Sequence, residues 1–345
     1  MFIIPIDNQL SYRSIPRNDT LKYSIANHCN APSRTAVVDW KGNCFVCSCE
    51  AWLPITVGNI MDFTQLSNIW NNPVSHALQK DIDDKKFSNC AVERCGILHE
   101  NRIQELYYLS INIDESCNLR CPSCRLDSIM YTEGPVYESK LNQVRHLVRL
   151  IEGFDYPIQI VMSGNGDPLA SNIMRPLIHE LKPRPHQTIR LFTNGLLLEK
   201  QLTGSSIVDN ITQYFISIDA GSAAVYENVR RPGRWDILLK NFDFLKTLVE
   251  TTHAEVLLKF VLQNDNWHDM QNFVNTCRAY GFKGVINRLE DWGTWEKFND
   301  HDVVGNSAHP DHAAAVDELR KIYQLYYDGL QLQFNPSLLT LCQTT

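Results

Sequence analysis

The chain has 345 residues, of which 44% are hydrophobic and 21% charged, and its formal net charge is −7. This composition is typical of a globular protein long enough for one barrel and an appendage. It contains no apolar run that would span a bilayer and no secretory leader. Its net negative charge argues against a partner that is bound mainly through phosphates. We therefore expect neither a membrane nor a nucleic-acid partner.

Cysteines are concentrated at the start of the chain, where six of the eleven lie in the first hundred residues. This clustering differs from the disulfide framework of a short secreted protein. It indicates metal binding in a reducing compartment, so we expect a cytoplasmic protein. The six are Cys29, Cys44, Cys47, Cys49, Cys90 and Cys95.

Three further cysteines, Cys117, Cys121 and Cys124, lie within the stretch ESCNLRCPSC. A structural zinc site uses four ligands, and so does an iron–sulfur cube that only transfers electrons. Three thiolates leave one metal position open. The spacing C-x3-C-x2-C therefore predicts a metal group that binds a substrate or a cofactor directly.

From residue 108 onward, short apolar or β-branched runs alternate with stretches of helical period. This alternation predicts a parallel sheet with right-handed crossovers. Six units are too few for an eight-stranded closed barrel, so the expected fold class is α/β with a partial (β/α)6 TIM-like barrel. Its chemistry should lie at the C-terminal ends of the strands, where the three-cysteine stretch begins. The predicted strands are 108–113, 158–162, 189–192, 214–218, 256–262 and 284–289.

The stretch CNLRCPSC after a strand resembles the cluster loop of the radical SAM (S-adenosylmethionine) enzymes. The resemblance implies that Cys117, Cys121 and Cys124 hold a [4Fe–4S] cluster and that SAM binds its fourth iron. It also implies reductive cleavage of SAM to methionine and a 5′-deoxyadenosyl radical, which abstracts a hydrogen from a substrate. Further family motifs occur in the expected order over residues 108–290.

The end of the second predicted strand, SGNGDPLAS, is similar to the family's glycine-rich acidic turn. The resemblance assigns Gly164, Asn165 and Gly166 to close approach of the cofactor and Asp167 to the SAM amino group. The family more often has Glu here, so the shorter Asp changes the contact geometry. A plain turn capped by Asp167 is the alternative.

Two later strand ends, LFTNGLLL and FISIDAGSAAVYENVRRPG, also resemble family motifs. Ser217 and Asp219 are two residues apart, so they share one face of an extended strand and are expected near the SAM ribose or the substrate. Arg230 or Arg231 is expected to pair with the SAM carboxylate, and a solvated basic pair is the alternative. The remaining implied contacts are Thr193 and Asn194.

The N-terminal cysteine stretch resembles a SPASM-type auxiliary-cluster domain, which follows the barrel in most relatives and precedes it here. A hairpin containing Gly42, a GNI turn, an IWN helix and closing cysteines occur in that order. The resemblance implies one auxiliary [4Fe–4S] cluster, with a structural zinc as the alternative and Cys44 as a buried thiol. The implied ligands are Cys29, Cys47, Cys90 and Cys95, with Cys49 a further candidate.

These motifs predict three domains: a cysteine-rich SPASM-like domain at 1–107, the radical SAM partial barrel at 108–290, and a loop and helix covering the barrel at 291–345. Relatives with a SPASM domain often crosslink, epimerise or excise residues of ribosomally made precursor peptides, so a peptide substrate is expected. The alternative is dehydrogenation or rearrangement of an aminocyclitol or sugar. A non-enzymatic scaffold is disfavoured because the SAM motifs are intact.

The resemblance also implies partners. The cysteine stretch occupies most of residues 1–107, which leaves no room there for a fused peptide-recognition domain. We therefore expect either that a separate recognition protein delivers the precursor peptide or that the barrel mouth alone recognises a short motif. An electron donor such as flavodoxin or ferredoxin is implied by the reductive chemistry.

Overall fold

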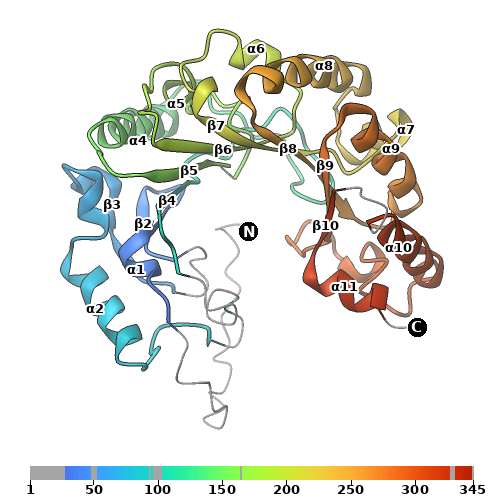
Figure 1. Cartoon of the computed structure of the whole chain (residues 1–345), viewed down its shortest axis with the longest axis horizontal. Coiled ribbons are helices and arrows are strands. Elements are labelled where there is room, and N and C mark those ends of the chain that lie inside the picture. The colour runs from blue at the N-terminus through green and yellow to red at the C-terminus, as the bar shows by residue number, and fades with distance from the viewer. Residues whose placement is uncertain are drawn as a thin grey trace.

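The computed structural model describes residues 28–47, 53–92, 95, 103–163, 165–326 and 331–343. Two predicted site residues, Cys49 and Gly164, lie outside these ranges. The described residues form a single ten-stranded sheet that curves into an arch, with helices along its convex side (Figure 1). None of the described helices is both long and apolar enough to cross a bilayer.

The six predicted strands are confirmed, and they lie side by side in chain order, all parallel. The arch does not close, as Figure 1 shows, so the partial barrel is also confirmed. The carboxyl ends of these strands point to the same edge of the arch, which brings the loops after them together. The strands are β4 (Tyr107–Ile111), β5 (Ile158–Met162), β6 (Gln187–Thr193), β7 (Ile211–Ser217), β8 (Glu255–Leu262) and β9 (Lys283–Arg288).

Helices connect successive strands across the convex face. Phe260 of β8 packs against Phe273 of the following helix, with ring centroids 5.0 Å apart. Alternation along each strand therefore buries one side chain under the helices and turns the next to the concave face, as for Leu191 and Phe192. The helices are α4 (Pro135–Glu152), α5 (Arg175–His179), α6 (Leu198–Leu202), η4 (Val208–Asn210), α7 (Ala223–Val229), α8 (Trp235–Thr252), η5 (Trp267–Asp269) and α9 (Met270–Tyr280).

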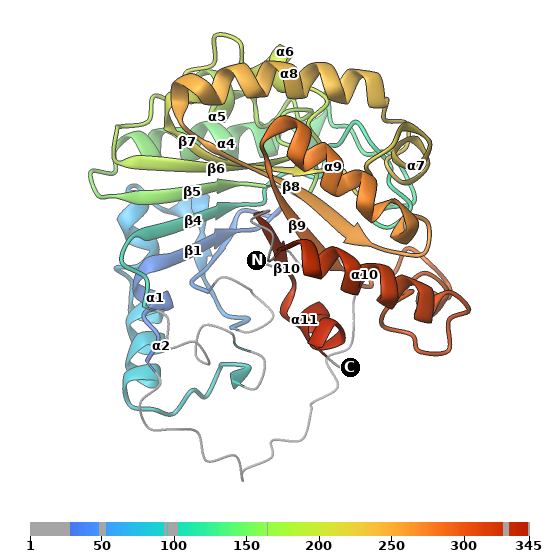
Figure 2. The same ribbon diagram turned by 45° about the vertical axis from the view of Figure 1, so that its right-hand side comes forward.

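Both ends of the sheet extend beyond the predicted strands (Figure 2). At one end β1 (Thr35–Val38) pairs in parallel with β4 and leads into the antiparallel strands β2 (Asn43–Phe45) and β3 (Thr56–Asn59). At the other end β10 (Leu332–Phe334) pairs with β9. The sheet thus runs across both predicted domain boundaries, and the three-domain division stays a prediction.

The remaining helices flank these two ends. The IWN stretch itself is the end of a 3-10 helix and a turn, and the longer helix begins after it, where Asn72 caps the first turn by accepting from Val74 and Ser75. The helix predicted within residues 291–345 corresponds to α10. These elements are α1 (Ala31–Arg34), η1 (Ile60–Asp62), η2 (Leu66–Ile69), α2 (Pro73–Asp83), η6 (Phe298–Asp300), α10 (His312–Tyr326) and α11 (Pro336–Gln343).

A buried lysine joins the β1–β2 turn to the loop that carries the three cysteines. The amine of Lys140, on α4, donates to the carbonyl of Ile113 at 2.6 Å and to that of Trp40 at 3.1 Å. Lys140 is 4% exposed, and burial lowers its pKa. The N-terminal hairpin is therefore fixed against the start of the cysteine loop.

Replacing Lys140 by methionine is expected to lower the free energy of unfolding by about 2–4 kcal/mol, because two buried carbonyls lose their donor. Chemical denaturation of the metal-free chain measures this. Arg145→Met, on the exposed side of the same helix, is the matched control and should unfold like the wild type. Identical midpoints for Lys140→Met and the wild type would show that the bridge contributes nothing.

Candidate SAM and iron–sulfur sites

The loops after β4 and β5 interlock at the carboxyl edge of the sheet. The amide of Asn165 donates to the carbonyl of Asp114 at 3.0 Å, and the amide of Asp167 donates to that of Ser116 at 2.8 Å. A Cβ on Gly166 would lie 2.1 Å from the carbonyl oxygen of Ser116, so only glycine fits. Gly166 therefore lets the two loops touch, and its predicted close approach to a cofactor stays a prediction.

The three predicted catalytic cysteines lie on one compact loop after β4. The carbonyl of Cys121 accepts from the amides of Cys124 and Arg125 at 2.9 and 3.1 Å, which brings Cys121 and Cys124 onto one turn. The amide of Cys117 donates to Ile129 at 2.9 Å and closes the loop. Cys121 is buried and Cys124 is exposed, so the site reaches the protein surface.

Hydrogen-bond donors point at the cysteine sulfurs of this loop. Cys117 Sγ accepts from the amide of Leu119 at 3.4 Å and lies 3.9 Å from Asn194 Nδ2, and Cys121 Sγ lies 3.6 Å from a guanidinium nitrogen of Arg230. Burial raises the pKa of Cys117 to about 12, and the carboxylate of Asp167 contributes. A bound metal removes these protons, and the donors then stabilise the thiolates.

Asp167 lies 3% exposed beneath this loop, and protein groups surround its carboxylate. One oxygen accepts from the amides of Leu169 and Ala170, at 2.9 and 3.2 Å. The other accepts from the Thr193 hydroxyl at 2.8 Å and the Asn194 amide at 2.6 Å. Burial raises the pKa of Asp167, and these four donors partly offset that effect.

Asp167 thus ties the end of β5 to the end of β6. In this structure its carboxylate positions the loop of Thr193 and Asn194, and its contact with the SAM amino group stays a prediction. Asn194 in turn donates to Asn118 of the cysteine loop at 2.7 Å. The acidic turn at Asp167 and the turn formed by Thr193, Asn194 and Gly195 (the TNG turn) therefore support the cysteine loop.

Asp219 and Arg230 form a buried ion pair against the cysteine loop, with 2.6 Å between the carboxylate and a guanidinium nitrogen. Burial lowers the pKa of Arg230, but Asp219 and Cys121 outweigh it and leave this pKa above its usual value. The two arginines of the predicted pair separate. Arg230 turns inward to Cys121, whereas the exposed side chain of Arg231 binds Asn228.

Ser217 and Asp219 do not continue one extended strand. β7 ends at Ser217, and Asp219 has a φ of 53°, in the left-handed region. This turn aims the Asp219 carboxylate at Arg230 and at the amide of Val261, which donates to it at 2.8 Å. The alternation rule fails here because it holds only while the backbone stays extended.

Arg125 is a site residue that the sequence analysis did not identify. Its guanidinium donates to the carbonyl of Glu115 at 2.7 Å and to that of Asn165 at 2.5 Å, so it ties the cysteine loop to the acidic turn. The only signal in the sequence is its place next to Cys124.

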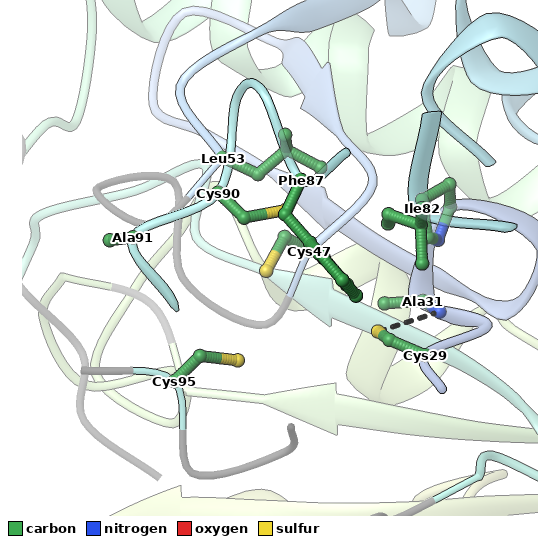
Figure 3. A pocket seen from close by; sticks show the side chains of 10 residues that line it. Cys29, Ala31, Cys47, Leu53, Ile82, Phe87, Cys90, Ala91 and Cys95 are labelled. Carbon is green, nitrogen blue, oxygen red and sulfur yellow. Dashed lines mark hydrogen bonds between the residues drawn. The ribbon is translucent and has the colours of Figure 1, made fainter. Parts of the chain in front are cut away.

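A second cysteine site lies in the N-terminal part of the sheet. Cys29, Cys47, Cys90 and Cys95 line one pocket, and Figure 3 shows their side chains around it. Burial raises the pKa of Cys90 to about 12, and Cys29 and Cys95 raise it further. No group of three His, Cys, Asp or Glu within the described ranges is arranged to hold a single metal ion. The pocket wall is otherwise apolar: Ala31, Pro32, Leu53, Ile82, Phe87 and Ala91.

Comparison with known proteins gives two family matches. Residues 111–277 match the model for the radical SAM superfamily, and residues 29–96 match that for SPASM, an iron–sulfur cluster-binding domain. The chain therefore contains a radical SAM domain and a SPASM domain. Its SPASM domain precedes the radical SAM domain, as the order of the cysteine motifs predicted.

The chain is also similar to GTP 3′,8-cyclases. It is 27% identical to GTP 3′,8-cyclase of Petrotoga mobilis over 175 residues, 49% of this chain and 51% of that protein. It is 30% identical to GTP 3′,8-cyclase of Alkaliphilus metalliredigens over 132 residues, 38% and 40% of the two chains. The chain thus spans about half the length of these relatives or less.

Two solved structures are similar to this chain. Streptococcus suis SuiB bound to precursor peptide SuiA has a TM-score of 0.43 and 13% identity, covering 80% of this chain and 68% of that one. The enzyme anSMEcpe with bound AdoMet has a TM-score of 0.43 and 16% identity, covering 66% and 63%.

The radical SAM domain implies SAM and a [4Fe–4S] cluster, and the SPASM domain implies auxiliary iron–sulfur clusters. The residues present fit both groups. Three cysteines share one surface-reaching loop with donors aimed at their sulfurs, and four further cysteines share one pocket. The SPASM match favours iron–sulfur over the zinc alternative.

Cys44 is the matched control for the SPASM pocket, because it is fully buried on β2 and does not line that pocket. Replacing Cys90 by serine is expected to remove about half of the iron, about four atoms per chain, while Cys44→Ser retains all of it. Iron and sulfide assays after anaerobic reconstitution measure both. Equal iron loss in the two variants would exclude Cys90 as a specific ligand.

Proposed function

We propose that this chain is an enzyme that cleaves SAM reductively and abstracts a hydrogen from a ribosomally synthesised precursor peptide, which it crosslinks, epimerises or excises. The cluster and SAM, when bound, supply the 5′-deoxyadenosyl radical. The protein's part is to hold these groups and keep the peptide C–H beside them, away from water.

The residues of the cysteine loop and its neighbours would hold these groups. Cys117, Cys121 and Cys124 hold the cluster, and Arg230, fixed by Asp219, donates to Cys121. Burial of the Asp219–Arg230 pair strengthens this contact because water does not compete for it. Asp167 acts indirectly, because it holds the TNG turn against the cysteine loop.

One observation carries the proposal: a single chain holds a three-cysteine loop open to the surface and a separate four-cysteine pocket. A cluster held by Cys29, Cys47, Cys90 and Cys95 would supply an acceptor for an electron from the substrate. The resemblance to SPASM-bearing enzymes then favours a peptide. The 27% sequence identity with the GTP 3′,8-cyclase of Petrotoga mobilis covers about half of each protein and supports the shared domain.

Partners follow from the same chemistry. We expect a flavodoxin or ferredoxin as electron donor, a reducing cytoplasm because thiolate clusters are oxygen-sensitive, and a separate protein that presents the precursor peptide. If a precursor peptide binds this chain tightly and unaided, the expectation of a separate delivery protein is wrong.

The test is anaerobic co-expression of the chain with each short open reading frame that flanks its gene, followed by mass spectrometry of the peptides. Loss of two hydrogens indicates a crosslink, deuterium uptake from heavy water at unchanged connectivity indicates epimerisation, and loss of a residue indicates excision. If the peptides are unchanged and an aminocyclitol or sugar is consumed, the peptide substrate is refuted and the small-molecule alternative is supported.

A further inference from the structure

The concave face of the sheet carries the side chains that face away from the helices. The strand register places Phe192 beside Phe215, and Ser217 beside Lys259. The two phenyl rings stack, with centroids 4.3 Å apart and planes 3° apart. Lys259 therefore lies next to the stacked rings of Phe192 and Phe215, near the carboxyl ends of the strands.

The backbone of Lys259 is firmly held. Its carbonyl accepts from the amides of Ile218 and Asp219 at 3.0 and 3.1 Å. Its amine lies 5.5 Å from the centroid of the Phe192 ring. Burial lowers the pKa of Lys259, Asp219 raises it, and Arg230 lowers it. The side chain projects from a rigid strand toward the concave face of the barrel, with its amine beside the Phe192 ring.

No carboxylate of the described residues neutralises Lys259 by an ion pair, and its amine makes no hydrogen bond within the same residues. Asp219 is already paired with Arg230 and accepts from Val261. Glu255, further down the same strand, binds Lys283 and Gln213. A half-buried ammonium without a counter-ion is costly, and an anionic ligand would relieve that cost.

We infer that Lys259 binds the carboxylate of an acidic residue, aspartate or glutamate, in the peptide substrate, with the methylene groups of that residue on the Phe192–Phe215 pair. Ammonium–carboxylate hydrogen bonds are strong in such a setting, and the stacked rings offer an apolar surface to the side-chain stem. The acidic residue would then sit beside the Asp219–Arg230 pair, which touches Cys121. This inference rests on the proposed function and names the chemistry of the residue bound.

The test uses the reconstituted, SAM-loaded chain and two capped pentapeptide libraries that differ only in a central glutamate or glutamine. Equilibrium dialysis is expected to show about tenfold stronger retention of the glutamate library by the wild type. Lys259→Met should abolish that preference, Lys259→Arg should keep part of it, and Lys240→Met, exposed on α8, should keep all of it. Circular dichroism confirms that each variant folds.

Four outcomes would count against the assignment. Wild-type protein that retains both libraries equally refutes the acidic preference. An unchanged preference in Lys259→Met refutes the role of Lys259 in that preference. If Lys259→Met no longer shows the SAM-induced change in the spectrum of the reduced cluster, Lys259 binds the SAM carboxylate instead of the peptide. Wild-type protein that retains GTP but neither library refutes the peptide substrate itself, which separates failure of the proposed function from failure of this inference.

Discussion

Replacing Cys117, Cys121 and Cys124 together by alanine is expected to lower the iron content from about eight to about four atoms per chain and to abolish SAM cleavage. The loop loses all three thiolates, while the SPASM pocket keeps Cys29, Cys47, Cys90 and Cys95. Iron and sulfide assays and the visible spectrum of the anaerobically reconstituted variant measure the effect.

The Cys277→Ala variant is the control for the loss of a thiol, because Cys277 is fully buried on α9, away from both cysteine sites. It should retain all of the iron. If the triple variant also kept all of its iron, the three-cysteine loop would not be a cluster site. Complete loss of iron would instead show that the two sites do not load independently.

Replacing Asp167 by alanine is expected to lower the free energy of unfolding by about 3–5 kcal/mol, because four buried donors lose their acceptor together. The TNG turn is then no longer tied to β5, so SAM binding should weaken as well. Asp167→Asn retains one acceptor oxygen and should show a smaller loss of stability. Urea denaturation measures the first effect, and the SAM-induced spectral change of the reduced cluster measures the second.

Asp127→Ala is the matched control, because Asp127 is an exposed aspartate of the cysteine loop. Its unfolding midpoint should equal that of the wild type. Were Asp167→Ala to share that midpoint, the four hydrogen bonds at Asp167 would have no net stabilising effect. Weakened SAM binding at unchanged stability would instead favour the direct contact with the SAM amino group.

The sequence predicted the six barrel strands because each is a short apolar run between helices of clear period, and a parallel sheet buries such runs. The hairpin around Gly42 was also predicted, and β1 and β2 form it. The pairing of β1 with β4 and the three-residue strand β10 were not predicted, because both strands are very short. Such short strands are defined by their pairing with β4 and β9, which is a tertiary property.

At the site, spacing alone predicted that Cys117, Cys121 and Cys124 share one loop, because residues close in sequence stay close in the fold, and their role as cluster ligands stays a prediction. The roles of Arg230 and Arg231 required the structure, since neighbouring residues at a helix end point in different directions. Lys259 was missed because a lysine in a strand resembles any edge or surface cation until the sheet curvature places it inside.

Formation of 5′-deoxyadenosine from SAM is the measurement that tests the account most directly. The reconstituted chain, reduced and kept free of oxygen, is mixed with SAM, and the products are separated and identified by mass. We expect 5′-deoxyadenosine and methionine from the wild type and neither from the Cys117/Cys121/Cys124→Ala variant. A fully iron-loaded wild-type chain that leaves SAM intact, with its peptide substrate or without, would contradict the assignment as a SAM-cleaving enzyme.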